Sequence, residues 1–127
     1  MALNVLIVDD ERDVEQLYVQ RFRHEVKSGE VKLHFAFCGN DALEILNGTN
    51  PMDILLVLSD INMPGMTGFE LVKLIRSKFP ELKVFMISAY GDDKHVSTAK
   101  DVGADDFIPK PVDFKILKEK IQSLKTA

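Results

Sequence analysis

The chain has 127 residues, of which 46% are hydrophobic and 28% charged, so it can build one hydrophobic core and is neither disordered nor collagen-like. Its formal net charge of -4 argues against direct binding of DNA or RNA, which needs a basic face. Cys38 is the only cysteine. An intramolecular disulfide and a cysteine zinc cluster are therefore excluded, and a reducing, cytoplasmic compartment is favoured.

Short apolar runs alternate with amphipathic segments along the whole chain. The runs are rich in β-branched and aromatic residues and bounded by turn-forming residues, which is typical of strands. The predicted strands are Leu3–Val8, Val31–Phe37, Ile54–Leu58, Val84–Ile87 and Phe107–Ile108. The longest continuous run, Ile54–Leu58, is far shorter than the ~20 residues that a membrane-spanning helix needs, so we expect no membrane insertion.

Apolar residues at helical spacing predict five helices between and after these strands. The predicted helices are Val14–Val26, Ala42–Leu46, Phe69–Phe79, Asp92–Val102 and Phe114–Leu124. Gly48 marks the end of the second, Pro80 stops the third, and Gly103 caps the fourth. The fourth of these carries few apolar residues. We therefore expect it to be the most weakly anchored element of the fold.

Strands that alternate with helices over residues 1–127 predict a single α/β domain. Near-continuous apolar character in the first, third and fourth strands indicates a parallel sheet that is covered on both faces. The expected architecture is a five-stranded, flavodoxin-like doubly wound (βα)5 fold. Its strand order of 2-1-3-4-5 is taken from common folds of this size rather than derived from the residue pattern.

Polar residues follow four of the five predicted strands. Asp9 and Asp10 follow the first, Asp60 the third, Ser88 the fourth and Lys110 the fifth. Each alone could be a helix cap, a turn residue or a solvated charge. Because ligands of open parallel sheets bind beyond the carboxyl ends of the strands, their joint placement predicts a site at this edge.

Three carboxylates at one edge would either raise one another's pKa or recruit a cation. Two carboxylates about 5 Å apart repel by ~3 kcal/mol at an effective dielectric of 20, and one lysine cannot neutralise three. An all-oxygen site with room for water suits Mg²⁺. A phosphoryl group could then approach, which makes Asp60 the candidate nucleophile, with Lys110 and the Ser88 hydroxyl meeting phosphoryl oxygens.

The motifs resemble the receiver domain of two-component response regulators over almost the whole chain. The likeness is carried by Val5–Glu11, Leu58–Gly68, Ser88-Ala89 and Lys110-Pro111. It implies that Asp60 accepts phosphate from a histidine kinase or histidine phosphotransfer protein. It also implies Mg²⁺ held by Asp9 (through water), Asp10, Asp60 and the backbone carbonyl of Asn62.

The resemblance assigns switching roles as well. Lys110 would pair with the phosphoryl group, Ser88 would hydrogen-bond it, and Phe107 would be the aromatic that changes rotamer. Tyr90 would shield the site and, with Asn62, tune the phosphate lifetime. The Lys110-Pro111 bond is often cis in the family, which proline makes accessible. Such domains act as regulatory phosphoacceptors rather than enzymes.

Signalling is expected through the face made by the fourth predicted helix, the fifth strand and the fifth helix. The recipient would be an output domain beyond Ala127 or a separate protein, and a homodimer is left open. Ser88 and Phe107 depart from the threonine and tyrosine that are commoner in the family at these positions, so Phe107 brings no hydroxyl to the switch.

Three alternatives remain. A Mg²⁺-dependent phosphohydrolase of the haloacid dehalogenase type also uses an aspartate nucleophile, but it needs a second aspartate where Asn62 stands and a cap segment that is missing. A flavodoxin-like cofactor carrier needs a phosphate loop where Asp9-Asp10-Glu11 would repel phosphate. The third is a receiver-like scaffold that is never phosphorylated, against which the complete acidic set argues.

Overall fold

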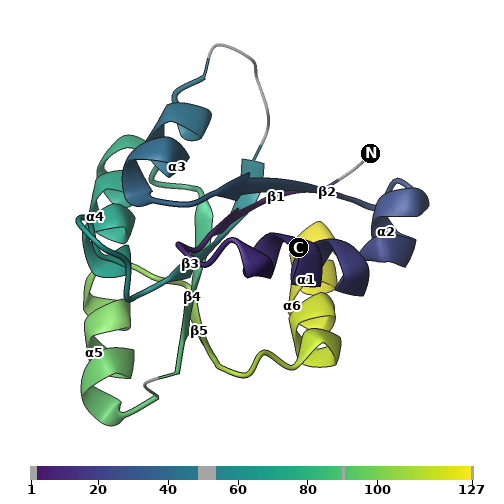
Figure 1. Cartoon of the computed structure of the whole chain (residues 1–127). Helices are drawn as coiled ribbons and strands as arrows, with labels where there is room; N and C mark the ends of the chain where they lie inside the picture. The colour runs from purple at the N-terminus through teal and green to yellow at the C-terminus, as the bar shows by residue number, and fades with distance from the viewer. Residues whose placement is uncertain (1–2, 49–53, 90, 127) are drawn as a thin grey trace.

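The computed structural model describes residues 3–48, 54–89 and 91–126, and Figure 1 shows one sheet between two layers of helices. The strands are β1 (Leu3–Val8), β2 (Val31–Ala36), β3 (Ile54–Asp60), β4 (Lys83–Ser88) and β5 (Asp106–Pro109). The helices are α1 (Asp13–Arg21), α2 (Arg23–Lys27), α3 (Gly39–Leu46), α4 (Gly68–Lys78), α5 (Asp93–Asp101) and α6 (Phe114–Thr126).

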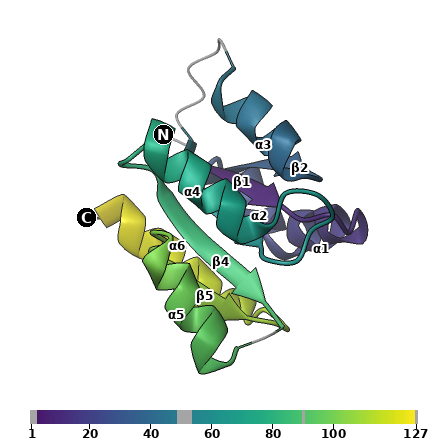
Figure 2. The ribbon, with the colours of Figure 1, turned by 90° about the vertical axis from the view of Figure 1, so that its left-hand side faces the viewer.

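All neighbouring strands pair in parallel, in the order β2-β1-β3-β4-β5. This confirms the predicted doubly wound fold and its strand order. The order reverses between β1 and β3, so the connections on the two sides of that point cross opposite faces. α3, α4 and α5 cover one face of the sheet, and α1, α2 and α6 lie on the other (Figures 1 and 2).

Two hydrophobic clusters fill the spaces between these layers. Alternate residues of β1 point to opposite faces, so Leu6 and Val8 join the cluster under α3, α4 and α5, while Val5 and Ile7 join the cluster under α1 and α6. Both faces of the central strands are therefore apolar, which explains why their sequences do not alternate.

The prediction of a single helix from Val14 to Val26 is wrong. The segment forms α1 and α2, separated at Phe22, whose backbone has φ -101° and ψ 15°. The Phe22 side chain is 1% exposed and packs parallel to the Tyr18 ring, with centroids 6.1 Å apart. Apolar spacing did not reveal the break because Phe22 stays on the buried face on which the periodicity depends.

Most of the other element bounds lie within two residues of the predictions, but α3 begins at Gly39, three residues before the predicted Ala42. β3, β4 and β5 are longer than their apolar runs, and β3 includes Ser59 and Asp60. β2 ends at Ala36, one residue early, and α3 ends at Leu46. Strand pairing continues past the last apolar side chain because it uses backbone groups. Asp60 therefore ends β3 rather than following it.

Among the described residues, α5 has one buried residue, Ala99, and α1 also has one, Tyr18, while α2 has none. Asp92 caps the first turn of α5 by accepting a hydrogen bond from the His95 amide, and Gly103 follows α5 with a φ of 103°. A single small buried side chain agrees with weak anchoring of α5, but α2 buries even less, so the prediction that α5 is the most weakly anchored element is not confirmed. No helix of the described chain combines the length and apolar character needed to span a bilayer.

Candidate functional site

The carboxyl ends of β1 and β3 bring three carboxylates together, here called the acidic cluster: Asp9, Asp10 and Asp60. One oxygen from each lies within 4.8 Å of the others. Asp9 and Asp60 are each 7% exposed, whereas Asp10 faces solvent. The cluster therefore has two fixed, buried members and one member open to water.

Backbone contacts orient both buried carboxylates. The amide of Glu11 donates to Asp9 Oδ1 at 2.9 Å, and the amide of Ile61 donates to Asp60 Oδ1 at 2.9 Å. In each residue the second oxygen, Oδ2, faces Lys110 instead. Two neighbouring strands thus present their carboxylates side by side with fixed orientations.

The turn after β3 holds Asp60 in place through a close backbone approach. The Gly68 amide donates to the Ile61 carbonyl at 2.8 Å, and a Cβ atom on Gly68 would lie 2.2 Å from the Asp60 carbonyl oxygen. Thr67 and Glu70 form a capping box that starts α4 directly after this contact. Glycine is required at position 68 because any larger residue would push α4 away from Asp60.

Lys110 supplies the positive charge of the site. Its Nζ atom lies 3.4 Å from Asp9 Oδ2 and 3.5 Å from Asp60 Oδ2, so one ammonium bridges both buried carboxylates. Its backbone amide donates to the Ser88 carbonyl at 2.9 Å, which fixes the loop to the end of β4. The bond from Lys110 to Pro111 is cis, as expected.

The electrostatics of the site are unbalanced. Burial and the neighbouring Asp9 charge raise the pKa of Asp60 above its ordinary value of 3.8, against the opposing effect of Lys110. Burial alone would lower the pKa of Lys110, but the charges of Asp60 and Asp9 outweigh it and raise that pKa. With one lysine against three carboxylates, the site keeps an excess of negative charge.

The donor set fits a divalent metal ion. Three carboxylates offer only hard oxygen ligands, and the exposed Asp10 leaves room for water on the open side. Oxygen ligands with space for retained water are what small divalent cations prefer. A divalent cation would also remove the negative excess that Lys110 leaves.

The structure brings together four of the predicted site residues, namely Asp9, Asp10, Asp60 and Lys110. Ser88 is fully buried at the end of β4, beside β3 and β5. Asn62 is exposed in the loop after β3, and Phe107 is half-buried on β5, packed against the cluster under α4 and α5. Tyr90 lies outside the described residues.

Sequence reasoning missed Tyr18 as a neighbour of the site. Helical spacing indicates only that Tyr18 is a core residue, and its side chain is indeed 3% exposed. Burial first, and then the charges of Asp9 and Asp60, raise the pKa of its hydroxyl. A tyrosine in an otherwise apolar stripe was the available signal, because its hydroxyl must face something polar or open.

Comparison with known proteins decides the family. The model of the response regulator receiver domain matches residues 5–122. The chain belongs to this family. It is a receiver domain of two-component response regulators, and neither the phosphohydrolase nor the cofactor-carrier alternative is favoured.

Curated relatives of this receiver domain are much longer proteins. It is 38% identical over 116 residues to the response regulator protein PilR of Pseudomonas aeruginosa, covering 90% of this chain and 24% of PilR. It is 35% identical over 119 residues to a cyclic di-GMP phosphodiesterase of Thermotoga maritima, covering 94% of this chain and 30% of that protein. The receiver domain thus spans under a third of each.

Solved receiver structures match it over almost its whole length. The chemotaxis response regulator CheY4 of Vibrio cholerae aligns with a TM-score of 0.81 and 27% identity, covering 98% of this chain and 99% of CheY4. The response regulator TrrA of Thermotoga maritima, solved with Mg²⁺ and BeF, aligns with a TM-score of 0.78 and 29% identity, covering 96% and 98%.

Proposed function

We propose that Asp60 is the phosphoacceptor of this receiver domain and that Mg²⁺ bound at the acidic cluster supports its phosphorylation. The observation that carries the proposal is the single Lys110 ammonium bridging two buried carboxylates beside a third, exposed one. Asp9, through water, together with Asp10, Asp60 and the Asn62 carbonyl would hold the ion. When bound, Mg²⁺ supplies positive charge that offsets the oxygens of an incoming phosphoryl group.

Asp60 is the nucleophile of this proposal. One of its carboxylate oxygens forms a bond to phosphorus while the bond from phosphorus to the donor's imidazole nitrogen breaks, leaving an acyl phosphate and a neutral histidine. The Ile61 amide holds the Asp60 carboxylate, which limits its rotation. Lys110 pairs with a phosphoryl oxygen, and the Ser88 hydroxyl donates a hydrogen bond to another.

The phosphodonor is a histidine kinase or a histidine phosphotransfer protein, acting in the cytoplasm. The lone Cys38, which has no partner for a disulfide in the chain, agrees with a reducing compartment. Phosphorylation acts on the face of α5, β5 and α6, with Ser88, Phe107 and Tyr90 as switch residues. The sparse burial of α5 supports this, because a weakly anchored helix moves at low cost.

The recipient of the signal is an output domain of the same protein or a separate partner. The lengths of the curated relatives support an attached output domain, and one of those relatives is a cyclic di-GMP phosphodiesterase. The receiver domain itself acts as a regulatory phosphoacceptor, with activity limited to its own phosphorylation and dephosphorylation.

The experiment that tests the function is incubation with Mg²⁺ and acetyl phosphate, followed by intact-protein mass spectrometry. We expect a gain of one PO₃ unit that Asp60→Asn abolishes and that the exposed-site control Asp41→Asn leaves unchanged. Asp10→Ala should raise the Mg²⁺ concentration required at least tenfold. Phosphate on another residue, or steady hydrolysis of many phosphate esters, would contradict the proposal.

A further inference from the structure

Ser59, the penultimate residue of β3, is a polar residue in an apolar position. Its side chain is fully buried. Val57 and Ile61, two residues before and after it, belong to the hydrophobic cluster under α3, α4 and α5, as do its partners in register, Val8 of β1 and Met86 of β4. An aliphatic side chain would suit this position, because a buried hydroxyl is costly unless it is hydrogen-bonded. The partner of the hydroxyl therefore indicates what Ser59 does.

That partner is the backbone of the next residue. The Ser59 hydroxyl donates a hydrogen bond to the Asp60 carbonyl at 3.0 Å. Gly68, the first residue of α4, packs against the same carbonyl oxygen, since a Cβ atom on this glycine would lie only 2.2 Å from it. The Asp60 carbonyl is thus contacted both by a hydroxyl from its own strand and by the start of the following helix.

The peptide group that Ser59 contacts also orients the carboxylate of Asp60. The Asp60 carbonyl and the Ile61 amide belong to one planar peptide unit, so they rotate together. The Ile61 amide donates to Asp60 Oδ1 at 2.9 Å and to the Ile87 carbonyl of β4 at 3.3 Å. A rotation of this peptide unit would move the amide away from the carboxylate. The Ser59 hydroxyl opposes that rotation from the carbonyl side.

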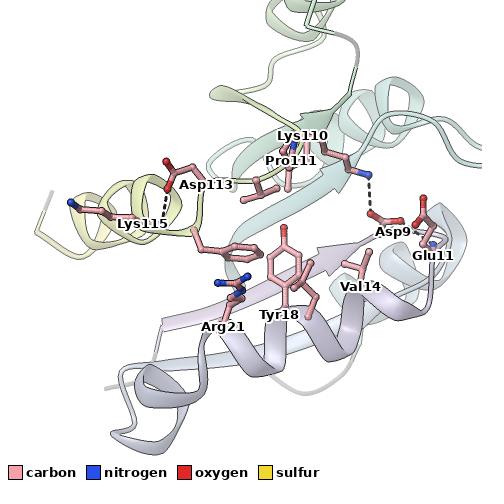
Figure 3. A pocket seen from close by; sticks show the side chains of 13 residues that line it. Asp9, Glu11, Val14, Tyr18, Arg21, Lys110, Pro111, Asp113 and Lys115 are labelled. Atoms are coloured by element: carbon pink, nitrogen blue, oxygen red, sulfur yellow. Dashed lines mark hydrogen bonds and ion pairs between the residues drawn. The ribbon is translucent and has the colours of Figure 1, made fainter.

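The second carboxylate oxygen of Asp60 depends on a more flexible partner. It faces Lys110, whose Nζ atom lies 3.5 Å from Asp60 Oδ2 and 3.4 Å from Asp9 Oδ2. Figure 3 shows the Lys110 side chain extending to Asp9 from the loop after β5. A lysine ammonium sits on a flexible four-carbon stem, whereas the Ile61 amide is part of the backbone. The direction of the Asp60 carboxylate is therefore set mainly by the peptide unit.

We propose that Ser59 is a positioning residue for the phosphorylation of Asp60, because its hydroxyl fixes the peptide unit that orients the Asp60 carboxylate. The inference rests on the proposed function, since it concerns the rate at which Asp60 takes up phosphate. Phosphoryl transfer depends on in-line placement of the attacking oxygen, and a small misplacement slows such a reaction. Ser59 itself forms no bond to phosphorus and acts only through Asp60.

The test compares the wild-type protein with Ser59→Ala and with Ser59→Cys, which keeps the size of the side chain but donates only weakly. Each protein is incubated with saturating Mg²⁺ and acetyl phosphate, and the PO₃ adduct is followed over time by intact-protein mass spectrometry. An Asp60 oxygen bonds to phosphorus as the bond from phosphorus to the acetyl oxygen breaks and releases acetate. We expect both variants to form the adduct about fivefold more slowly, the factor that one hydrogen bond contributes.

A second measurement reads the peptide unit directly in the unphosphorylated protein. Hydrogen exchange is followed by NMR at the Ile61 amide, and at the Leu58 amide in the same strand for comparison. Without the Ser59 hydroxyl, the Ile61 amide should exchange about fivefold faster, because its peptide unit opens more often. Exchange at Leu58 should be unaltered. A merely destabilised domain would instead accelerate exchange at both amides.

Two control variants separate positioning from stability. Ser28→Ala removes a hydroxyl that also donates to a backbone carbonyl, that of Glu25 at 3.1 Å, but in an exposed turn. It should leave the adduct rate unchanged. Leu117→Ala removes a fully buried side chain of α6 and should destabilise the domain more than Ser59→Ala does. At a temperature where circular dichroism shows it folded, it should form the adduct at the wild-type rate.

The outcomes distinguish this inference from the proposed function. If the wild-type protein formed no adduct, the proposed function would fail. If the wild-type protein and Ser59→Ala formed the adduct equally fast, only the role of Ser59 would be rejected. The same conclusion would follow from a wild-type rate in Ser59→Cys, from unchanged exchange at the Ile61 amide in Ser59→Ala, or from equal slowing in Leu117→Ala.

Discussion

Asp60 is the residue at which function and stability oppose each other. It ends a central strand at 7% exposure, with Asp9 beside it and Lys110 as the nearest cation. Burial and the Asp9 charge raise its pKa. The folded state therefore binds a proton at Asp60 more readily than the unfolded state does, and keeping Asp60 ionised at neutral pH lowers the free energy of unfolding.

Asp60→Asn should stabilise the metal-free protein at pH 7. The raised pKa means that wild-type stability increases as pH falls from above the folded-state pKa of Asp60 toward its ordinary value of 3.8. The variant lacks this titration, so its advantage should be largest at neutral pH and shrink as pH falls. We expect a melting temperature a few degrees higher at pH 7, measured by circular dichroism.

The control for this prediction is Glu81→Gln, which removes a carboxylate from the exposed turn between α4 and β4. It should change the melting temperature little at any pH. If the higher melting temperature of Asp60→Asn persisted undiminished in acid, the ionisation of Asp60 would not be the cause of the stabilisation.

Gly68 limits what the turn after Asp60 can tolerate. Gly68→Ala would place Cβ 2.2 Å from the Asp60 carbonyl oxygen and 2.8 Å from the Ile61 Cα. Because both are backbone atoms, relief requires movement of Asp60, the proposed phosphoacceptor. We expect a loss of about 1–3 kcal/mol in the free energy of unfolding, measured by urea denaturation, and slower formation of the phosphoryl adduct.

Gly91→Ala is the matched control, since a Cβ at that glycine meets nothing within 4 Å. It should leave stability within about 0.5 kcal/mol of wild type. Equal losses in the free energy of unfolding for Gly68→Ala and Gly91→Ala would show that the close approach of Gly68 to Asp60 is not the cause.

At the scale of elements, Arg76 joins α4 to the segments on either side of β4. Its Nε donates to the Gly103 carbonyl at 2.8 Å, its Nη1 to the Leu82 carbonyl at 2.5 Å, and its Nη2 pairs with Asp105 at 2.6 Å. Asp105 in turn accepts the Val84 amide at 2.8 Å. The carboxyl-terminal end of α5 is thus fastened, while little of its remaining length is buried.

Arg76→Gln should loosen the turn between α5 and β5. The substitution leaves the Gly103 and Leu82 carbonyls without their donor, which we expect to lower the free energy of unfolding by about 2 kcal/mol. Hydrogen exchange should accelerate at Val84 and Asp105. Because a lysine cannot reproduce the fork of donors, Arg76→Lys should not restore the protection.

Lys73→Gln provides the comparison, since Lys73 is an exposed cation on the same helix. It should leave exchange at Val84 and Asp105 unaltered. Acceleration spread evenly over the sheet in Arg76→Gln would indicate global destabilisation rather than a local fastening.

At the scale of the whole molecule, stability depends on both faces of one sheet. The cluster under α3, α4 and α5 and the cluster under α1 and α6 share β1, β3 and β4 as their common wall. Neither layer of helices has a core without those strands. We therefore expect damage to one face to be felt by the entire domain.

Leu117→Ala should lower the free energy of unfolding by about 2–5 kcal/mol, because Leu117 is fully buried in α6. Near- and far-ultraviolet circular dichroism in urea should still report one coincident transition. The adjacent Ile116 is 47% exposed. Ile116→Ala should therefore lower the free energy of unfolding by less than about 1 kcal/mol. Two separated transitions in Leu117→Ala would show that the faces unfold independently.

Short-range patterns in the sequence determined the strands and most of the helices. Continuous apolar runs predicted the two-sided sheet, and turn chemistry at Gly103 and Pro80 marked where helices end. The break at Phe22 and the polar ends of β3 and β4 could not be predicted this way. The break depends on the backbone conformation at Phe22, and the strand ends depend on backbone pairing. Neither can be inferred from the pattern of apolar side chains.

The sequence by itself also determined which chemical groups reach the sheet edge, since Asp9, Asp10, Asp60 and Lys110 each stand at a strand end. Only the tertiary structure decided that one ammonium bridges two of the carboxylates, that Gly68 must lack a side chain, and that Tyr18 lies near the acidic cluster. Distances between residues far apart in the chain arise from strand order and helix packing, and no local property of the sequence encodes them.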